Sequence, residues 1–249
     1  MSSDLQTLDV SQDWAVASDV QARFMQFPSA QTRTLTYSAR CRQMRSLGGD
    51  CFDFLPLSGR RIALTVADAS GKGLPAALII ANVQSSLRTA ALFAPDDPAA
   101  VVSAVNRQLH ASSPVERYAT LFYGVFDEDT RMLNYVNAGH NAPLLIRRDG
   151  STQWLDADAP PVGFFAATAY STRTVQLHPG DLIVAWTDGV VEATNHVDEE
   201  WTVRGLLAAM AACPARQPER IVASVFEALD EFSGDTQTDD ATILAALVN

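Results

Sequence analysis

The chain has 249 residues, a formal net charge of −11 and 47% hydrophobic residues. This length fits one large domain or two small ones, and the composition is that of an ordinary soluble globular protein. The acidic balance argues against a nucleic-acid partner, which needs a basic face against its phosphates, and against an anionic membrane surface. It is compatible with carboxylates that converge on divalent cations.

The cellular compartment is predicted from the cysteines and the N-terminus. Cys41, Cys51 and Cys213 are too few and too scattered for a disulfide framework or a CxxC metal site. The first residues lack the basic segment and the apolar core of a secretory signal. The most apolar run, residues 74–81, is shorter than the ~18 residues that span a bilayer. We therefore expect a cytoplasmic protein with no membrane partner and no nucleic-acid partner.

An N-terminal helix is predicted over residues 11–27, before Pro28. Apolar side chains recur there at three- and four-residue intervals: Trp14, Ala17, Val20, Phe24 and Phe27. This stripe either packs on the rest of the protein or pairs with a second copy. We treat residues 1–30 as an N-terminal helical extension that contacts a dimer partner or a regulator, and residues 31–249 as the domain itself.

Further along the chain, strand patterns and helix patterns come in blocks. Because successive strands are close in sequence and helices follow one another, the pattern predicts an α+β fold with antiparallel sheets. The helix over 75–93 is apolar almost all round and is expected to be largely buried. We expect strands near 32–39, 48–54, 61–68, 119–126, 133–137, 143–147, 172–177, 182–186 and 241–248, and helices near 75–93, 97–111, 203–212 and 218–232.

Four acidic residues share one position, the end of an apolar strand beside a turn: Asp50, Asp68, Asp188 and Asp239. A single carboxylate of this kind is often a solvated turn residue. Four of them, each adjoining a strand predicted to be central, indicate a site instead. Asp50 and Asp68 belong to consecutive strands that we expect to pair. Hard oxygen ligands select Mg²⁺ or Mn²⁺ over zinc.

Other catalytic patterns are missing from the sequence. A Walker A loop would need glycine at Val66, and no cysteine has an arginine six residues on. The four histidines show no paired ligand spacing, and we interpret His140 as a loop-structuring residue rather than a metal ligand. No Gly-x-Ser-x-Gly nucleophile elbow is present.

The motifs together resemble the bacterial SpoIIE/RsbU-type serine/threonine phosphatases, the bacterial branch of the type-2C metal-dependent phosphatases. The resemblance runs from about residue 20 to the C-terminus. It rests on six segments in order: Gly48-Gly49-Asp50 with Asp53; Asp68-Ala69-Ser70-Gly71-Lys72-Gly73 with Ala76-Ala77; Tyr118-Ala119-Thr120-Leu121; Ala138-Gly139-His140-Asn141; Gly180-Asp181 with Thr187-Asp188-Gly189 and Glu192-Ala193; and Asp239-Asp240-Ala241-Thr242.

The resemblance implies a fold and a metal centre. The fold would be two stacked antiparallel β-sheets flanked by helices on both faces, an αββα sandwich, and the centre would hold two divalent cations, Mn²⁺ or Mg²⁺. Asp68 would bridge the cations and the backbone carbonyl of Ala69 would add a ligand. Asp240 could take the place of Asp239 as a ligand, and Asp53 is a possible outer residue. The site would be completed by Asp50, Asp188 and Asp239.

The resemblance also implies a reaction and a partner. A water shared by the cations would attack phosphoserine or phosphothreonine, so no protein nucleophile is required. The substrate would be a phosphorylated STAS-domain protein, an anti-sigma factor antagonist. In this family an N-terminal helix commonly joins a regulator or dimerises. The sequence leaves two alternatives open: a catalytically silent module that only binds partners, and a metal-dependent hydrolase of a small phosphorylated molecule.

Overall fold

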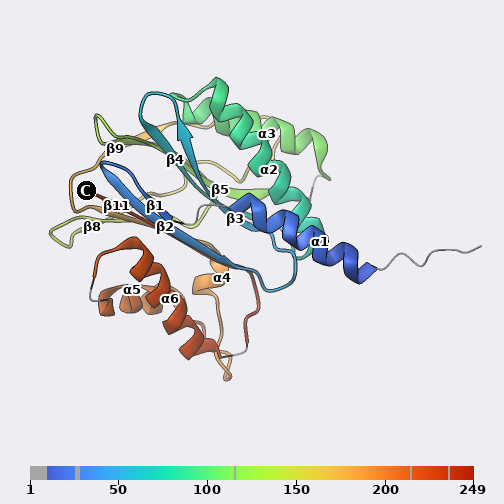
Figure 1. Ribbon diagram of the computed structural model, residues 1–249. Coiled ribbons are helices and arrows are strands. Elements are labelled where there is room, and N and C mark those ends of the chain that lie inside the picture. The colour runs from blue at the N-terminus through green and yellow to red at the C-terminus, as the bar shows by residue number, and fades with distance from the viewer. Residues whose placement is uncertain (1–9, 26–28, 115, 214, 235) are drawn as a thin grey trace, which may run out of the picture.

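The computed structural model describes residues 10–25, 29–114, 116–213, 215–234 and 236–249. Over these residues the chain forms two antiparallel sheets stacked face to face, with helices on both outer faces (Figure 1). The α+β class and the αββα sandwich implied by the resemblance are confirmed.

One sheet has five strands in the order β3-β4-β5-β6-β9. β3 and β4 are antiparallel in a register that sets Asp50 opposite Asp68, which confirms the expected pairing. The same sheet sets Ala69 opposite Ala119. Its strands are β3 (Asp50–Leu57), β4 (Arg61–Ala69), β5 (Ala119–Asp127), β6 (Met132–Ala138) and β9 (Arg173–Gln176).

The other sheet has six strands in the order β1-β2-β11-β10-β7-β8. β10 lies inside this sheet with all five of its residues buried, as its unbroken apolar sequence predicts. β1 and β8 are exposed three-residue strands at the two edges and carry too little apolar pattern to be predicted. The strands are β1 (Ser29–Gln31), β2 (Leu35–Arg42), β7 (Leu144–Ile146), β8 (Thr152–Trp154), β10 (Leu182–Trp186) and β11 (Ala241–Val248).

Two pairs of helices cover the sheets. α2 and α3 pack on the five-stranded sheet, and α5 and α6 pack on the six-stranded one (Figure 1). The expected end of the first helix at Phe27 and the break at Pro214 fall outside the described residues. The helices are α1 (Val10–Ala22) with the 3₁₀ turn η1 (Arg23–Met25), α2 (Leu74–Phe93), α3 (Pro98–Ser112), α4 (Asp188–Val191), α5 (Thr202–Ala212) and α6 (Pro218–Ser233).

The prediction that α2 is largely buried is wrong for one of its faces. Leu78 is 64% exposed and Phe93 is 85% exposed, while the opposite face packs on the sheet and α3. By length and composition α2 could cross a membrane. Its buried face, which includes Ile80, Val83 and Leu87 in one hydrophobic cluster with the sheet, is typical of a core helix instead.

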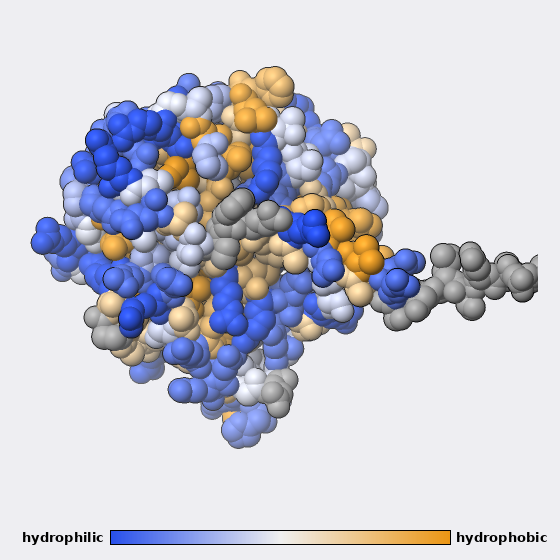
Figure 2. Space-filling model, viewed as in Figure 1, coloured by the Kyte–Doolittle hydropathy of each residue, from blue (hydrophilic) through white to orange (hydrophobic). Residues whose placement is uncertain are grey.

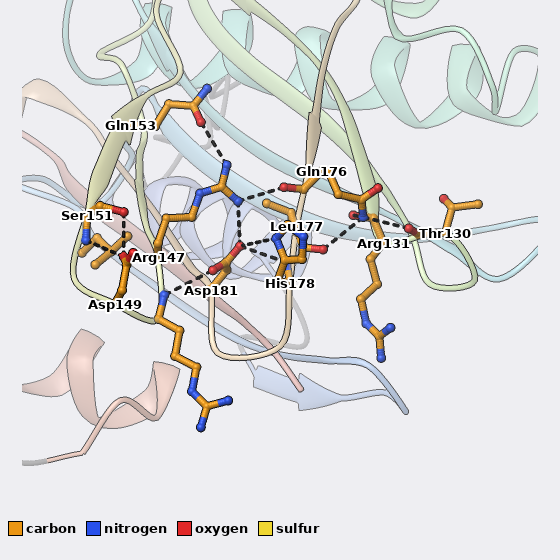
Figure 3. A network of polar contacts seen from close by, with 12 residues as sticks. Thr130, Arg131, Arg147, Asp149, Ser151, Gln153, Gln176, Leu177, His178 and Asp181 are labelled. Carbon is orange, nitrogen blue, oxygen red and sulfur yellow. Dashed lines mark hydrogen bonds and ion pairs between the residues drawn. The ribbon is translucent and has the colours of Figure 1, made fainter.

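A network of polar contacts fixes the start of β10 (Figure 3). The buried carboxylate of Asp181 accepts hydrogen bonds from Arg147 Nη1 at 2.8 Å and from the backbone N–H of His178 at 2.9 Å. Arg147 also reaches Gln153 and the carbonyl of Gln176. Asp181 and Asp188 flank opposite ends of β10, so this network holds the strand while the candidate site lies at the strand's other end.

Candidate metal centre

The four predicted acidic residues converge at one end of the sandwich. Asp50 begins β3 and is paired with Asp68 near the end of β4. Asp188 follows β10 directly, and Asp239 lies just before β11. The end of β10 and the start of β11 are joined because Thr187 N–H donates to the carbonyl of Thr242 at 3.1 Å. Residues from four strand ends, far apart in sequence, therefore meet at one place.

Asp50 is the most deeply buried of the four acids. Its Oδ2 accepts hydrogen bonds from Thr187 Oγ1 and Thr242 Oγ1, each at 2.7 Å, so the hydroxyls of one sheet hold a carboxylate of the other. Burial, reinforced by the neighbouring Asp68 carboxylate, raises the pKa of Asp50 well above its ordinary value, although the two hydroxyls act in the opposite direction. Both threonines occur in the sequence motifs, but the motifs do not indicate that their hydroxyls hold Asp50.

Burial and neighbouring carboxylates raise the pKa values of Asp68 and Asp188. Burial and then the carboxylates of Asp188, Asp239 and Asp240 raise the pKa of Asp68 to about 8. Burial and then Asp239 raise the pKa of Asp188. Carboxylates that raise one another's pKa in this way form a concentrated negative field, which a bound cation would neutralise.

Asp239 and Asp240, which the sequence leaves interchangeable, have different environments. The buried carboxylate of Asp240 accepts hydrogen bonds from the backbone N–H groups of Gly49 at 2.6 Å and Met44 at 2.7 Å. Asp239 is half-buried, and its Oδ2 lies 2.7 Å from Lys72 Nζ. Asp240 therefore anchors the loop before β3, whereas the carboxylate of Asp239 pairs with Lys72 and accepts from the backbone N–H of Asp240 at 2.9 Å.

Two glycines permit this close approach of the backbone. A Cβ on Gly189 would lie 2.0 Å from the carbonyl oxygen of Asp240, so no side chain fits there. A Cβ on Gly49 would lie 2.9 Å from the Cβ of Ala76 and 3.2 Å from the carbonyl oxygen of Ala69. Side chains at these positions would push apart the segments that carry the acids.

Three cations surround the loop that joins β4 to α2. Lys72 Nζ donates to the carbonyl of Thr238 at 2.8 Å in addition to its ion pair with Asp239. Arg117 Nη1 donates to the carbonyl of Ser70 at 3.1 Å. The guanidinium of the exposed Arg45 lies beside Gly73, within 3.4 Å of where a Cβ would stand. Lys72 lies within one of the quoted motifs, whereas Arg45 and Arg117 lie in none of them, and the fold places all three side chains beside this loop.

The donor chemistry fits hard divalent cations. Carboxylate oxygens and the nearby carbonyl of Ala69 are the ligands that Mg²⁺ and Mn²⁺ prefer. Among the residues that the structure describes, no three His, Cys, Asp or Glu side chains stand in a ready-made coordination cage. Asp239 is directed to Lys72 and Asp50 to two threonines.

Two further residues quoted in the sequence motifs lie apart from the acids. Asp53 is on the face of β3 that packs toward α2, where Arg88 Nε donates to it at 2.6 Å and Nη2 at 2.9 Å. His140 is buried, its Nδ1 lies 2.8 Å from Thr120 Oγ1, and burial lowers its pKa to about 4. Asp53 thus joins β3 to α2, and the interpretation of His140 as a loop-structuring residue agrees with these contacts.

Comparison with known proteins gives the family. The sequence profile of Stage II sporulation protein E matches residues 58–249, most of the chain. The chain belongs to the SpoIIE family. This confirms the resemblance seen in the motifs.

The curated relatives are longer than this chain. Protein IcfG of Synechocystis is 23% identical over 92% of the chain and 40% of the relative. Phosphoserine phosphatase RsbU of Bacillus subtilis is 25% identical over 74% of the chain and 55% of the relative. The chain therefore corresponds to about half the length of these proteins, and what the whole proteins do is not carried over directly.

Solved structures share the fold. The RsbU and RsbW domains of Rv1364c from Mycobacterium tuberculosis match with a TM-score of 0.73 and 28% identity, over 87% of this chain and 60% of that one. The SiaA-PP2C domain of Pseudomonas aeruginosa matches with a TM-score of 0.83 and 17% identity, over 96% and 97%. The catalytic domain of the phosphatase PstP, solved with two manganese ions, matches with a TM-score of 0.65 and 17% identity, over 86% and 98%. The expected Mn²⁺ or Mg²⁺ requirement agrees with this family.

Proposed function

We propose that residues 31–249 form a metal-dependent phosphoprotein phosphatase that removes phosphate from phosphoserine or phosphothreonine of a regulatory partner. The observation that carries this proposal is the convergence of Asp50, Asp68, Asp188 and Asp239 on one end of the sandwich. Burial and the neighbouring carboxylates raise the pKa values of Asp50, Asp68 and Asp188, which indicates a site that a cation completes.

The residues have separate roles in this proposal. Asp68 lies among the other acids and would hold the divalent cations together with the backbone carbonyl of Ala69. Asp50, Asp188 and Asp239 complete the ligand set, while Asp240 acts as an anchor. Bound divalent cations supply an activated water and neutralise charge on the phosphoryl oxygens. Arg45, Lys72 and Arg117 attract and orient the phosphate through their positive charge.

For the partner, we propose a phosphorylated STAS-domain protein in the cytoplasm. Support comes from the relatives named phosphoserine phosphatase RsbU and RsbP, both of Bacillus subtilis. Hydrolysis of a small phosphorylated molecule is the competing activity, since carboxylate ligands of the cations do not distinguish a phosphorylated protein from a small phosphorylated molecule. A silent binding module is disfavoured because all four acids are present and lie close together.

The decisive experiment incubates the purified chain with phosphorylated STAS-domain proteins, with and without Mn²⁺. Loss of phosphate that requires the metal supports the proposal, and binding without any loss supports the silent module. Faster release from small phosphorylated metabolites than from every STAS protein would favour the competing hydrolase. An Asp68→Asn variant, which should release no phosphate, controls for contaminating phosphatases.

The N-terminal extension is proposed to contact a dimer partner or a regulator. Trp14, Val16 and Val20 leave apolar surface exposed on α1, where Figure 2 shows orange atoms beside the helix. Removing residues 1–28 should change the mass in solution or the activity. An unchanged mass together with unchanged activity would contradict this role.

A further inference from the structure

Two adjacent phenylalanines in the loop before β9 have solvent-exposed side chains. Phe164 is 42% exposed and Phe165 is 53% exposed. Their rings meet edge to face with centroids 4.8 Å apart, and Phe164 meets the ring of the half-buried Tyr118 at 5.1 Å. We call Tyr118, Phe164 and Phe165 the aromatic cluster. Contiguous exposed apolar side chains of this kind are typical of an interaction site.

The loop of the aromatic cluster is held in place by Asn106 on α3. The buried side chain of Asn106 accepts from the backbone N–H of Gly163 at 2.8 Å and donates to the carbonyl of Phe165 at 3.0 Å. Tyr170 OH donates to the same Asn106 oxygen at 3.2 Å. Because backbone on both sides of Phe164 is fixed, the exposure of the rings is a built feature of the surface.

The sheet register places this cluster close to the candidate metal centre. Ala69, next to Asp68, lies opposite Ala119, and Ala119 in turn bridges Val162. Neighbouring strands are about 4.8 Å apart, so Val162 lies roughly 10 Å from Ala69. Phe164 follows Val162 by two residues, which sets its ring about 10–15 Å from the acids.

Positive charge borders the aromatic cluster on the side of the acids. The backbone N–H of Ser70 donates to the carbonyl of Tyr118 at 2.9 Å, which joins the cluster to the loop after Asp68. Arg117, which precedes Tyr118, lies at this junction and donates to the carbonyl of Ser70, whereas the ammonium group of Lys72 in the same loop contacts Thr238 and Asp239. In a chain of net charge −11, a cation beside an apolar surface matches a phosphorylated segment and not a second copy of this acidic chain.

We propose that the aromatic cluster is the docking surface for an apolar side chain of the phosphoprotein substrate. This inference rests on the proposed function and adds how the substrate protein is recognised. An extended segment advances about 3.3 Å per residue, so about three to five residues span the distance from the cluster to the acids. The docked apolar residue therefore stands three to five positions from the phosphorylated serine or threonine.

Two fluorescently labelled phosphoserine peptides test this proposal. They differ only in carrying leucine or serine four positions from the phosphoserine on both sides. Release of phosphate with Mn²⁺ is measured for the wild type, for the double variant Phe164→Ser, Phe165→Ser, and for Phe93→Ser as a matched control. Phe93 is also an exposed phenylalanine, and it lies at the far end of α2, about 30 Å along the helix from the loop after Asp68. An aryl phosphate serves as a substrate without a peptide.

The wild type should cleave the leucine peptide with a kcat/KM about tenfold above that of the serine peptide, through KM, which corresponds to burying one apolar side chain. The double variant should lose this preference, and Phe93→Ser should keep it. Equal rates for the two peptides in the wild type, or an unchanged preference in the double variant, would overturn the docking surface while leaving the phosphatase intact.

The failure of the proposed function would look different. If neither the peptides nor the aryl phosphate loses phosphate with Mn²⁺, the chemistry is wrong, and the peptides survive for a binding measurement by fluorescence anisotropy. Tighter binding of the leucine peptide that disappears in the double variant would still support the docking surface. Equal binding of both peptides would overturn it. Thermal melting of each variant checks that the fold is retained.

Discussion

The side chain of Gln21 and the backbone of Gly48 hold each other through two hydrogen bonds. Gln21 Nε2 donates to the carbonyl of Gly48 at 2.7 Å, and the N–H of Gly48 donates to Gln21 Oε1 at 3.1 Å. Gly48 lies two residues before Asp50, and its neighbour Gly49 donates to Asp240. The N-terminal helix is therefore hydrogen-bonded to the segment that positions the candidate metal centre.

Replacing Gln21 with alanine should weaken metal binding as well as stability. The change leaves the buried N–H and carbonyl of Gly48 without partners, which costs about 1–3 kcal/mol in the free energy of unfolding. Urea unfolding and calorimetric titration with Mn²⁺ measure the two effects. Gln12→Ala, on the exposed face of the same helix, is the control. An unchanged Mn²⁺ affinity in the Gln21 variant would separate α1 from the metal centre.

Asp68→Asn should abolish Mn²⁺-dependent hydrolysis of an aryl phosphate while the protein stays folded. The amide is isosteric but cannot supply the charge of a bridging carboxylate. It also relieves repulsion from Asp188 and Asp239, so unfolding of the metal-free protein should become harder. Turnover is measured by release of the coloured phenol, with Asp149→Asn in an exposed turn as the control. Normal turnover by the Asp68 variant would contradict the mechanism.

Asp239→Asn and Asp240→Asn should fail in different ways. The Asp239 variant should lose affinity for Mn²⁺ with little change in stability, because that carboxylate is half-exposed and paired with Lys72. The Asp240 variant should lose about 1–3 kcal/mol of stability, since an amide nitrogen would face a backbone N–H donor of Gly49 or Met44. Titration calorimetry and urea unfolding distinguish them. The reverse pattern would make Asp240 the ligand.

Lys72→Met should tighten the binding of Mn²⁺ about two- to fivefold. The ammonium group of Lys72 pairs with Asp239 in the structure, so a cation arriving at that carboxylate must displace it. Exposed ion pairs contribute about 0.2–1 kcal/mol, which sets the size of the effect. Calorimetric titration gives the affinity, and Lys72→Arg, which keeps the charge, should resemble the wild type. Weaker binding in the methionine variant would show that Lys72 supports the metal centre.

The metal-free protein should lose stability as the pH rises from 6.5 to about 8. The pKa of Asp68 is raised to about 8 in the folded chain, so the folded state holds a proton that the unfolded state has released. Stability contributed by that proton is present at lower pH and lost as the pH passes the folded pKa. His140, with its pKa lowered to about 4 from 6.5, is neutral in the folded state over this interval. It is half protonated in the unfolded state at pH 6.5, so it adds a smaller change of the opposite sign at the lower end of the interval.

Urea unfolding at a series of pH values measures this loss, which we expect to be on the order of 2 kcal/mol. Saturating Mn²⁺ should remove the dependence, because the cation takes over the neutralisation of the carboxylates. Asp68→Asn should also flatten the curve in the absence of metal. A free energy of unfolding that rises with pH over this interval would show that the pKa of Asp68 is not raised and would contradict the prediction.

The arrangement of the layers could be foreseen from the sequence. The apolar run of β10, the Asp97-Pro98 start of α3 and the hairpin of β5 and β6 are local signals, and each appears in the structure near its expected position. The half-exposed face of α2 could not be foreseen, because hydropathy alone does not show how much of a helix its neighbours cover. Similarly, β1 and β8 exist through pairing with longer strands and have no pattern of their own.

The sequence by itself determined the family, the sandwich and the set of acids, since motif order and strand ends are written along the chain. Only the tertiary structure decided what surrounds each acid. It joined Asp50 to Thr187 and Thr242, gave Asp240 an anchoring role, and brought Lys72 to Asp239. These relationships depend on strand register and on loop closure between segments more than a hundred residues apart, and spacing along one chain carries no information about either.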